Sequence, residues 1–192
     1  DRSRGLGDVY KRQLDVYNWS TAAGGNIAQY SYWGGACQLW ILEKASDTKG
    51  TDISLSANDL TYGNYTNAIT SGSFTIGASS GKNVAVLNRN ATVNGTSYSK
   101  VLQMNGGGNS TGRYIKFTAT GACTVKVTAA STSTSASRTL RLASGSVGGS
   151  TVGNATITGT PSTVTYKIPS AGTYYLYSTR SGIYVYQVNV AY

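Results

Sequence analysis

The stretch GRYIKFTATGACTVKVTAASTSTSASRTLRLASG, residues 112–145, alternates apolar and polar side chains in three short runs. Alternation with a period of two is the pattern of a strand that buries only one of its faces. In CTVKV, Val125 and Val127 are therefore expected to face one way while Lys126 faces the other. The stretch predicts consecutive antiparallel strands that contribute to one core.

The same pattern recurs from Asn58 to Tyr192, where clusters of Gly, Ser and Asn separate the runs and no helical periodicity occurs. Many short strands at this spacing predict an all-β fold, an antiparallel β-sandwich of jelly-roll-like form. The run IYVYQVNVAY is apolar on both sides, which predicts a central strand. The alternating runs are GSFTIGAS, KNVAVLN, YSKVLQMN, RYIKFTAT, CTVKVTAAS, RTLRLAS, NATITG, TVTYKIP, GTYYLYS and IYVYQVNVAY.

Charge is distributed unevenly along the 192 residues, whose formal net charge is +9. The last carboxylate side chain is that of Asp59, and residues 60–192 contain ten Lys or Arg but no Asp, Glu or His. A chain this basic is suited to an anionic partner, which could be nucleic acid, an acidic polysaccharide or an anionic surface. The alternative is that the basic charge serves only solubility.

The N-terminal segments differ from this pattern. Residues 1–13, DRSRGLGDVYKRQ, have no periodicity and resemble translated sequencing-adapter read-through, so we exclude them from functional reasoning and expect the true start of the protein to be missing. Residues 46–57, SDTKGTDISLSA, are predicted to form a linker or a first strand. Residues 58–192 are long enough to fold as an independent sandwich.

Residues 14–45 contain LDV, NIAQYSY and QLW in that order and resemble one repeat of the ricin-type β-trefoil lectins. The resemblance implies that Asp15 accepts hydrogen bonds from sugar hydroxyls, that Tyr30 stacks on the sugar ring and that Gln38 completes the pocket. Cys37 stands where the family usually has Asn, and a trefoil needs three repeats where this chain has one. We therefore expect a fragment of a β-trefoil repeat, either a weak neutral-sugar site or only the apolar remnant of one.

The predicted sandwich lacks the residues that catalysis usually needs. Glycoside hydrolysis usually needs two carboxyl groups, and Asp59 has no acidic partner after it. The chain has no histidine to act as a general base or to ligate zinc, and its two cysteines, Cys37 and Cys123, allow at most one disulfide. We expect a non-catalytic module without cofactor or metal.

Residues 58–192, with SGKNVAV, SYSKVLQMNGGG and GTYYLYSTRSGIYVYQVNV, resemble the C-terminal modules of secreted bacterial pectate lyases. These are the pectin-binding carbohydrate-binding modules of family 77. The resemblance implies a secreted, extracellular module that is part of a larger polysaccharide lyase or glycoside hydrolase. It also implies that the module binds homogalacturonan through contacts between lysines and sugar carboxylates. It assigns the contacts to Lys82 and Lys100, with Lys167 or Arg180 as a third.

Two other functions fit the same composition. A nucleic-acid binder would also be basic and aromatic, but these cations are spread evenly and no reader motif is present, so we expect no nucleic-acid partner. A structural or adhesive extracellular domain without a defined ligand is the second alternative. No apolar run approaches the length needed to cross a bilayer, so we expect no membrane partner. We also expect the chain to be a monomer.

Overall fold

The computed structural model describes residues 12–16, 27–31 and 50–192. The chain divides into two compact units, Asp1–Thr48 and Lys49–Tyr192. Among the described residues, no helix has both the length and the apolar character needed to span a membrane.

The first unit contains one described feature, an antiparallel pair of short strands, β1 (Arg12–Val16) and β2 (Ile27–Ser31). Two of the residues that the ricin-type resemblance assigns to sugar binding lie on these strands, Asp15 on β1 and Tyr30 on β2. The third, Gln38, lies outside the described residues. Sugar binding by this segment stays a prediction.

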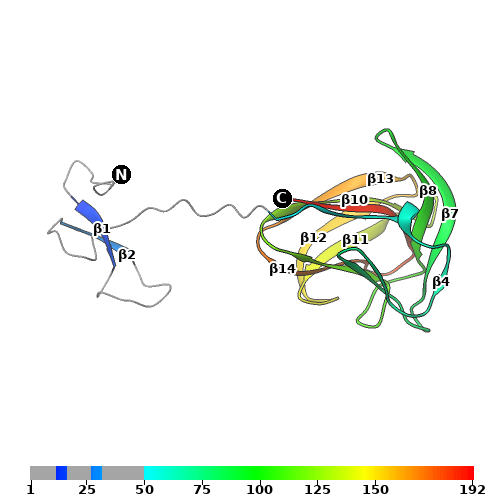
Figure 1. The fold of residues 1–192 in the computed structure, drawn as a ribbon, viewed down its shortest axis with the longest axis horizontal. Coiled ribbons are helices and arrows are strands. Elements are labelled where there is room, and N and C mark those ends of the chain that lie inside the picture. The colour runs from blue at the N-terminus through cyan, green and yellow to red at the C-terminus, as the bar shows by residue number, and fades with distance from the viewer. Residues whose placement is uncertain (1–11, 17–26, 32–49) are drawn as a thin grey trace. The chain divides into compact units, whose positions relative to one another are not determined.

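The second unit is a sandwich of two antiparallel sheets (Figure 1). The seven-stranded sheet has the order β13-β10-β15-β8-β7-β4, with β3 paired to β15 outside this path. Its strands are β3 (Ile53–Ser56), β4 (Gly63–Tyr65), β7 (Val84–Val93), β8 (Thr96–Met104), β10 (Cys123–Ser131), β13 (Ser162–Ile168) and β15 (Ile183–Ala191).

The six-stranded sheet has the order β12-β11-β14-β9-β6-β5, and all its pairs are antiparallel. Its strands are β5 (Ile69–Ser71), β6 (Phe74–Gly77), β9 (Tyr114–Ala119), β11 (Arg138–Ser144), β12 (Ser150–Ile157) and β14 (Gly172–Ser178). A 3-10 turn, η3 (Ala57–Asp59), follows β3. The predicted all-β antiparallel sandwich is confirmed, and each predicted run from Asn58 onward overlaps a strand. The short strands β4 and β5 lie outside the predicted runs.

The central position predicted for the last strand is also confirmed. One edge of β15 pairs with β10, while its other edge pairs with β8 through residues 183–185 and with β3 through residues 187–190. The strand β3 lies within residues 46–57, the segment predicted as a linker or a first strand. The sandwich therefore includes residues that precede Asn58.

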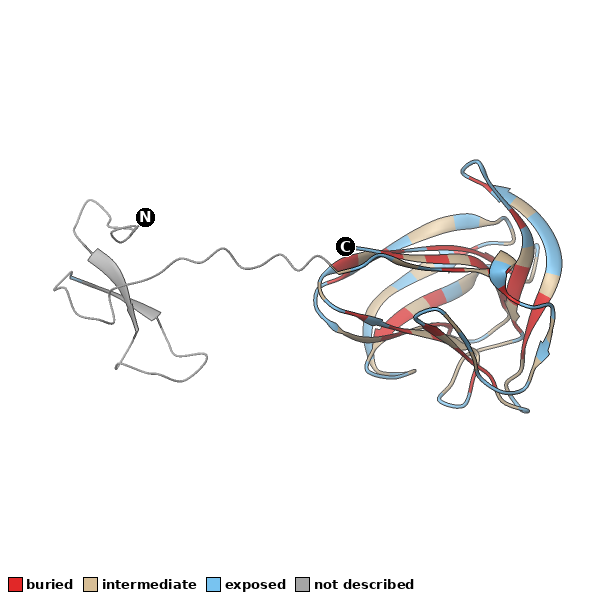
Figure 2. Ribbon diagram, in the orientation of Figure 1, coloured by how far each residue is buried: buried red, intermediate tan, exposed pale blue. Residues whose placement is uncertain are grey.

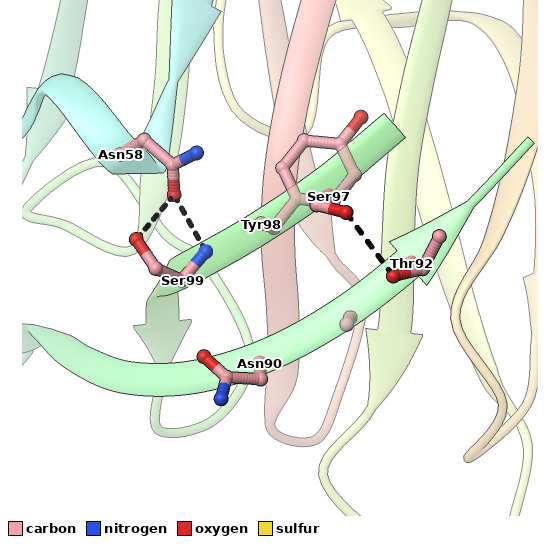
Figure 3. A pocket seen from close by; sticks show the side chains of 7 residues that line it. Asn58, Asn90, Thr92, Ser97, Tyr98 and Ser99 are labelled. Atoms are coloured by element: carbon pink, nitrogen blue, oxygen red, sulfur yellow. Dashed lines mark hydrogen bonds between the residues drawn. The ribbon is translucent and has the colours of Figure 1, made fainter. Parts of the chain in front are cut away.

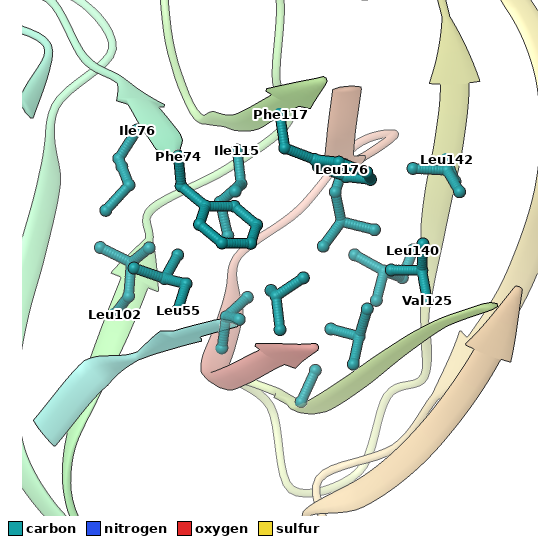
Figure 4. Close-up of a cluster of buried hydrophobic side chains, with 14 of the residues drawn as sticks. Leu55, Phe74, Ile76, Leu102, Ile115, Phe117, Val125, Leu140, Leu142 and Leu176 are labelled. Atoms are coloured by element: carbon teal, nitrogen blue, oxygen red, sulfur yellow. The ribbon is translucent and has the colours of Figure 1, made fainter. Parts of the chain in front are cut away.

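The main core fills the space between the two sheets (Figure 4). In CTVKV, Val125 and Val127 are fully buried while Lys126 is exposed, as the alternation predicts. Buried residues line the inner faces of the strands, whereas exposed ones occupy the outer faces and turns (Figure 2). The Tyr166 hydroxyl of β13 donates a hydrogen bond to the Leu140 carbonyl of β11 at 2.9 Å and so joins the two sheets.

A second, smaller hydrophobic cluster lies where the far half of the β7–β8 hairpin packs against β10 and β15. The hairpin carries a bulge between Asn88 and Ala91, and bulges bend a strand away from a flat sheet. The Tyr98 ring lies 5.4 Å from the Tyr186 ring, between centroids. The buried members of the cluster are Val93, Tyr98, Val101, Ala130 and Tyr186.

Candidate ligand-binding face

The ten cations of residues 60–192 fall into two groups. Within residues 50–192 none of them forms an ion pair with a carboxylate. Six are nevertheless held by neutral partners, because their side chains donate hydrogen bonds to carbonyl, amide or hydroxyl oxygens. These six are Arg89, Lys100, Arg113, Arg138, Arg141 and Lys167.

The other four are Lys82, Lys116, Lys126 and Arg180, whose side chains make no hydrogen bond within the described part of the chain. The absence of counter-charges therefore does not mean that every cation is available to a ligand. A ligand site is best sought where a free cation lies beside exposed aromatic or polar groups.

The outer face of the six-stranded sheet meets this condition. Alternation in YIKF buries Ile115 and Phe117 and leaves Tyr114 and Lys116 partly exposed on the other side of β9. Alternation in TYYLY gives Tyr175 the same outward direction on β14. Tyr114, Lys116, Arg141, Tyr175 and Tyr177 share this outer side, and we call it the tyrosine face.

Two partly exposed rings form the centre of the tyrosine face. The Tyr114 and Tyr175 ring centroids lie 5.3 Å apart in an edge-on arrangement with planes at 66°. Tyr114 lies close over Gly77, since a Cβ atom on Gly77 would fall 2.3 Å from the Tyr114 Cζ. A side chain at residue 77 would have to displace the ring, so Gly77 holds the space in which Tyr114 rests.

Two cations flank these rings. Lys116 lies opposite Tyr175 on one neighbouring strand and opposite Thr75 on the other. Arg141 lies two strands from Lys116 on β11, and its Nε donates to the Asn154 Oδ1 at 2.9 Å. The terminal nitrogens of Arg141 have no hydrogen-bond partner in the described residues. Strand spacing places the Lys116 and Arg141 Cα atoms roughly 12 Å apart.

Two loops border the tyrosine face and bury Tyr177. The Gly148 N–H donates to the Tyr177 hydroxyl at 3.1 Å, and a Cβ atom on Gly108 would fall 2.7 Å from the Tyr177 Cβ. Tyr177 is 4% exposed, so it supports the face from below the loops and offers little surface to a ligand.

Of the residues assigned by the pectin-module resemblance, Lys82 and Arg180 lie in loops that pack against the same segment, residues 107–112. The Gly107 N–H donates to the Arg180 carbonyl at 2.8 Å, and a Cβ atom on Gly112 would fall 2.9 Å from the Lys82 Cβ. Because this segment leads into β9 just before Tyr114, both loops border the end of the tyrosine face.

The other two assigned residues lie elsewhere. The Lys100 ammonium donates to the carbonyls of Asn58 at 3.2 Å and Leu60 at 2.8 Å, so it holds the turn η3 against β8. The exposed Lys167 donates to the Thr124 Oγ1 at 2.9 Å on the seven-stranded sheet, beside the strand that carries Lys126. The structure therefore does not gather the four assigned residues into one site, and ligand contact by each stays a prediction.

Sequence reasoning gave no weight to Lys116, Tyr114 and Tyr175 as a group. They could have been found from the alternation in YIKF and TYYLY, which points Tyr114, Lys116 and Tyr175 outward, together with the pairing of β9 and β14. The alternation was visible in the sequence, but the pairing that places Lys116 opposite Tyr175 was not.

No protein-family model matches the sequence, and comparison with curated proteins gives no match. Similar solved structures include a chain from work on glycan recognition by the Ruminococcus flavefaciens cellulosome, with 15% identity over 74% of this chain and 95% of that one and a TM-score of 0.47. The xylan-binding CBM22-1 domain from Paenibacillus barcinonensis Xyn10C has 14% identity over 72% and 92%, with a TM-score of 0.47. The C-terminal CBM6 of LamC from Zobellia galactanivorans has 10% identity over 74% and 100%, with a TM-score of 0.37. Likenesses at these scores do not bear on what this chain binds.

Proposed function

We propose that residues 50–192 form a non-catalytic module that binds an anionic polysaccharide, homogalacturonan, through the tyrosine face. The observation that carries the proposal is the arrangement of Lys116 and Arg141 around the partly exposed rings of Tyr114 and Tyr175. No acidic side chain occurs in residues 60–192, so nothing on this face repels or neutralises a carboxylate.

The chemistry of the ligand matches both parts of the face. A polyuronate presents a carboxylate on each sugar ring, and such a group accepts strong hydrogen bonds from ammonium and guanidinium donors. The terminal nitrogens of Arg141 can bind a carboxylate through two parallel hydrogen bonds, while Lys116 acts as a point charge. The sugar rings supply apolar C–H surfaces that pack on Tyr114 and Tyr175.

Lys82 and Arg180 extend the proposal to the end of the face. Neither side chain has a hydrogen-bond partner in the described residues, and their loops lead to the segment before Tyr114. A long chain laid across the tyrosine face could meet these cations with further carboxylates. The pectin-module resemblance of residues 58–192 supports the same ligand and a role in targeting a secreted plant-cell-wall enzyme.

The test is affinity electrophoresis of the full chain through gels that contain polygalacturonate. We expect retardation that Tyr175→Ala reduces at least about fivefold, because one ring of the platform is lost, and that 0.5 M salt largely removes. A structural or adhesive domain without a defined ligand would migrate as it does in a gel without polymer.

Fully methyl-esterified pectin separates charge from shape. Esterification removes the anion while the sugar chain is kept, so we expect the esterified polymer to retard the chain much less than the free acid. Equal retardation by the two polymers would contradict the cation–carboxylate contact.

A further inference from the structure

We propose that a polar groove on the β7–β8 hairpin is a second binding site, which takes an uncharged sugar unit. The groove belongs to the seven-stranded sheet, whereas the tyrosine face is the outer side of the six-stranded sheet. The proposal does not depend on polygalacturonate binding, because the two sites share no residue.

The groove has a volume of about 440 Å³, which falls within the range of small-molecule sites. Its lining groups come from both strands of the hairpin and from the turn η3 (Figure 3). All of its polar side chains are amides or hydroxyls, and none is charged. The lining residues are Asn58, Asn90, Ala91, Thr92, Ser97, Tyr98 and Ser99.

The side of the groove formed by η3 is fixed by several hydrogen bonds. The Asn58 Oδ1 accepts from the Ser99 N–H at 2.9 Å and from the Ser99 hydroxyl at 3.3 Å (Figure 3). It also accepts from the Lys100 N–H at 3.1 Å. The Lys100 ammonium holds the carbonyls of Asn58 and Leu60 from the other side. Lys100 therefore acts here as a positioning residue for Asn58.

The base of the groove is equally well supported. Tyr98 is 6% exposed, its ring packs on Tyr186, and its hydroxyl donates to the Gln187 Oε1 at 2.7 Å. Arg89 joins the same layer, since its Nε donates to the Tyr186 hydroxyl at 3.1 Å and its guanidinium lies 4.5 Å from the Tyr184 ring centroid. A groove whose walls are already ordered loses little conformational entropy when a ligand binds.

Several polar groups remain free to meet a ligand. The Asn58 Nδ2 donates to no group in the described residues, and the exposed Asn90 side chain makes no hydrogen bond there. The exposed hydroxyls of Thr92 and Ser97 share one long contact of 3.4 Å. The groove thus offers amide donors and acceptors together with hydroxyls that can do both.

This set of groups selects the chemical class of the ligand. A carboxylate or phosphate would find no cation in the lining, because the Lys100 ammonium is engaged by carbonyls. A metal ion would find no carboxylate there. Sugar hydroxyls both donate and accept hydrogen bonds, so an uncharged sugar unit complements the amides and hydroxyls of the groove.

The test is an NMR titration of the full, ¹⁵N-labelled chain with neutral oligosaccharides of galactose, arabinose, xylose and glucose. We expect at least one of them to shift the backbone amide signals of Ser97 and Ser99 and the side-chain amide of Asn90. The exposed Asn90 makes no internal hydrogen bond, so Asn90→Ala should leave folding intact and weaken binding about fivefold to tenfold.

Asn64→Ala is the matched control, because Asn64 is an exposed asparagine on β4 outside the groove lining. It should bind as the unchanged chain does, and so should Tyr175→Ala on the tyrosine face. If none of the four sugars moves the signals of Ser97 and Ser99, or if Asn90→Ala binds unchanged, the proposal is overturned. Failure of polygalacturonate retardation alone would overturn the tyrosine face and leave the groove standing.

Discussion

The two outer sides of the sandwich use tyrosine and cationic side chains in different ways. On the seven-stranded sheet, the β7–β8 hairpin covers Tyr186, and Arg89 donates its hydrogen bond to the Tyr186 hydroxyl. On the six-stranded sheet, Tyr114 and Tyr175 stay partly exposed, and Lys116 has no partner in the described residues. The same residue types stabilise the fold where an element covers them and remain available where none does.

This difference teaches how to interpret a basic, tyrosine-rich sequence. The number of cations without a carboxylate partner overstates the number that are available to a ligand. Carbonyl, amide and hydroxyl oxygens can accept hydrogen bonds from cations without any carboxylate. Covered residues should therefore change stability when mutated, and uncovered residues should change binding alone.

The largest effect is expected from Tyr186→Ala on the covered side. Tyr186 is fully buried between the hairpin and β10, so truncation should destabilise the sandwich by about 3–5 kcal/mol. Urea unfolding followed by far-UV circular dichroism measures the change in the free energy of unfolding. Tyr175→Ala is the uncovered counterpart and should cost less than about 1 kcal/mol; equal losses would erase the distinction between the two sides.

Lys100→Ala should have the next largest effect. Removing the ammonium leaves the carbonyls of Asn58 and Leu60 without its hydrogen bonds and loosens η3, for a loss of about 1–3 kcal/mol. The same urea experiment on Lys116→Ala should give a change within about 0.5 kcal/mol, since that lysine has no partner. If Lys100→Ala leaves the free energy of unfolding unchanged, the Lys100 side chain does not support the turn η3.

Gly77→Ala sharpens the comparison from the uncovered side. The new Cβ would collide with the Tyr114 ring and move it out of its place beside Tyr175. We expect polygalacturonate affinity to fall about tenfold, about 1.4 kcal/mol of binding free energy, as measured by affinity electrophoresis. Gly81→Ala is the control, because a Cβ atom there meets nothing within 4 Å. If Gly77→Ala leaves the affinity for polygalacturonate unchanged, the position of the Tyr114 ring does not contribute to binding.

The smallest effect concerns pH and the buried Tyr166. Burial raises the pKa of the Tyr166 hydroxyl well above its ordinary value of 10. The unfolded chain therefore loses this proton first as the pH passes 10, and the folded state loses stability, by about 1 kcal/mol between pH 10 and pH 11. Burial raises the pKa of the Cys123 thiol in the same direction.

Tyr166→Phe isolates the contribution of the tyrosine, because the cysteine is kept. The variant should be less stable at neutral pH, since the Leu140 carbonyl loses its donor, but its stability should fall less steeply above pH 10. Urea midpoints at pH 8 and pH 11 give the comparison. If the urea midpoint falls equally between pH 8 and pH 11 in both proteins, the ionisation of Tyr166 does not contribute to the loss of stability.

Much of the fold was predictable because alternation acts locally. The bounds of β10 and β11 coincide with the runs CTVKVTAAS and RTLRLAS, and the two-sided apolar run of β15 indicated its central position. The shared edge of β15, divided between β8 and β3, was not predictable, because it depends on segments far apart in the sequence.

The candidate site was less predictable than the fold for the same reason. Lys100 lies within the predicted run YSKVLQMN, yet its ammonium donates hydrogen bonds to carbonyls about 40 residues earlier in the chain. Lys116 resembles any outward lysine until β9 pairs with β14 and places it opposite Tyr175. Residue type and strand alternation indicate which cations are candidates for ligand binding. The pairing of distant strands decides which of these cations are hydrogen-bonded within the protein and which remain available to a ligand.

The most direct test compares Lys116→Ala with Lys126→Ala in polygalacturonate affinity gels. Both lysines lie on outward strand positions and have no partner in the described residues, but only Lys116 lies beside Tyr175. We expect Lys116→Ala to lose at least about tenfold in affinity while Lys126→Ala binds as the unchanged chain does. Equal losses in the two variants would mean that net charge, and not the tyrosine face, holds the polymer.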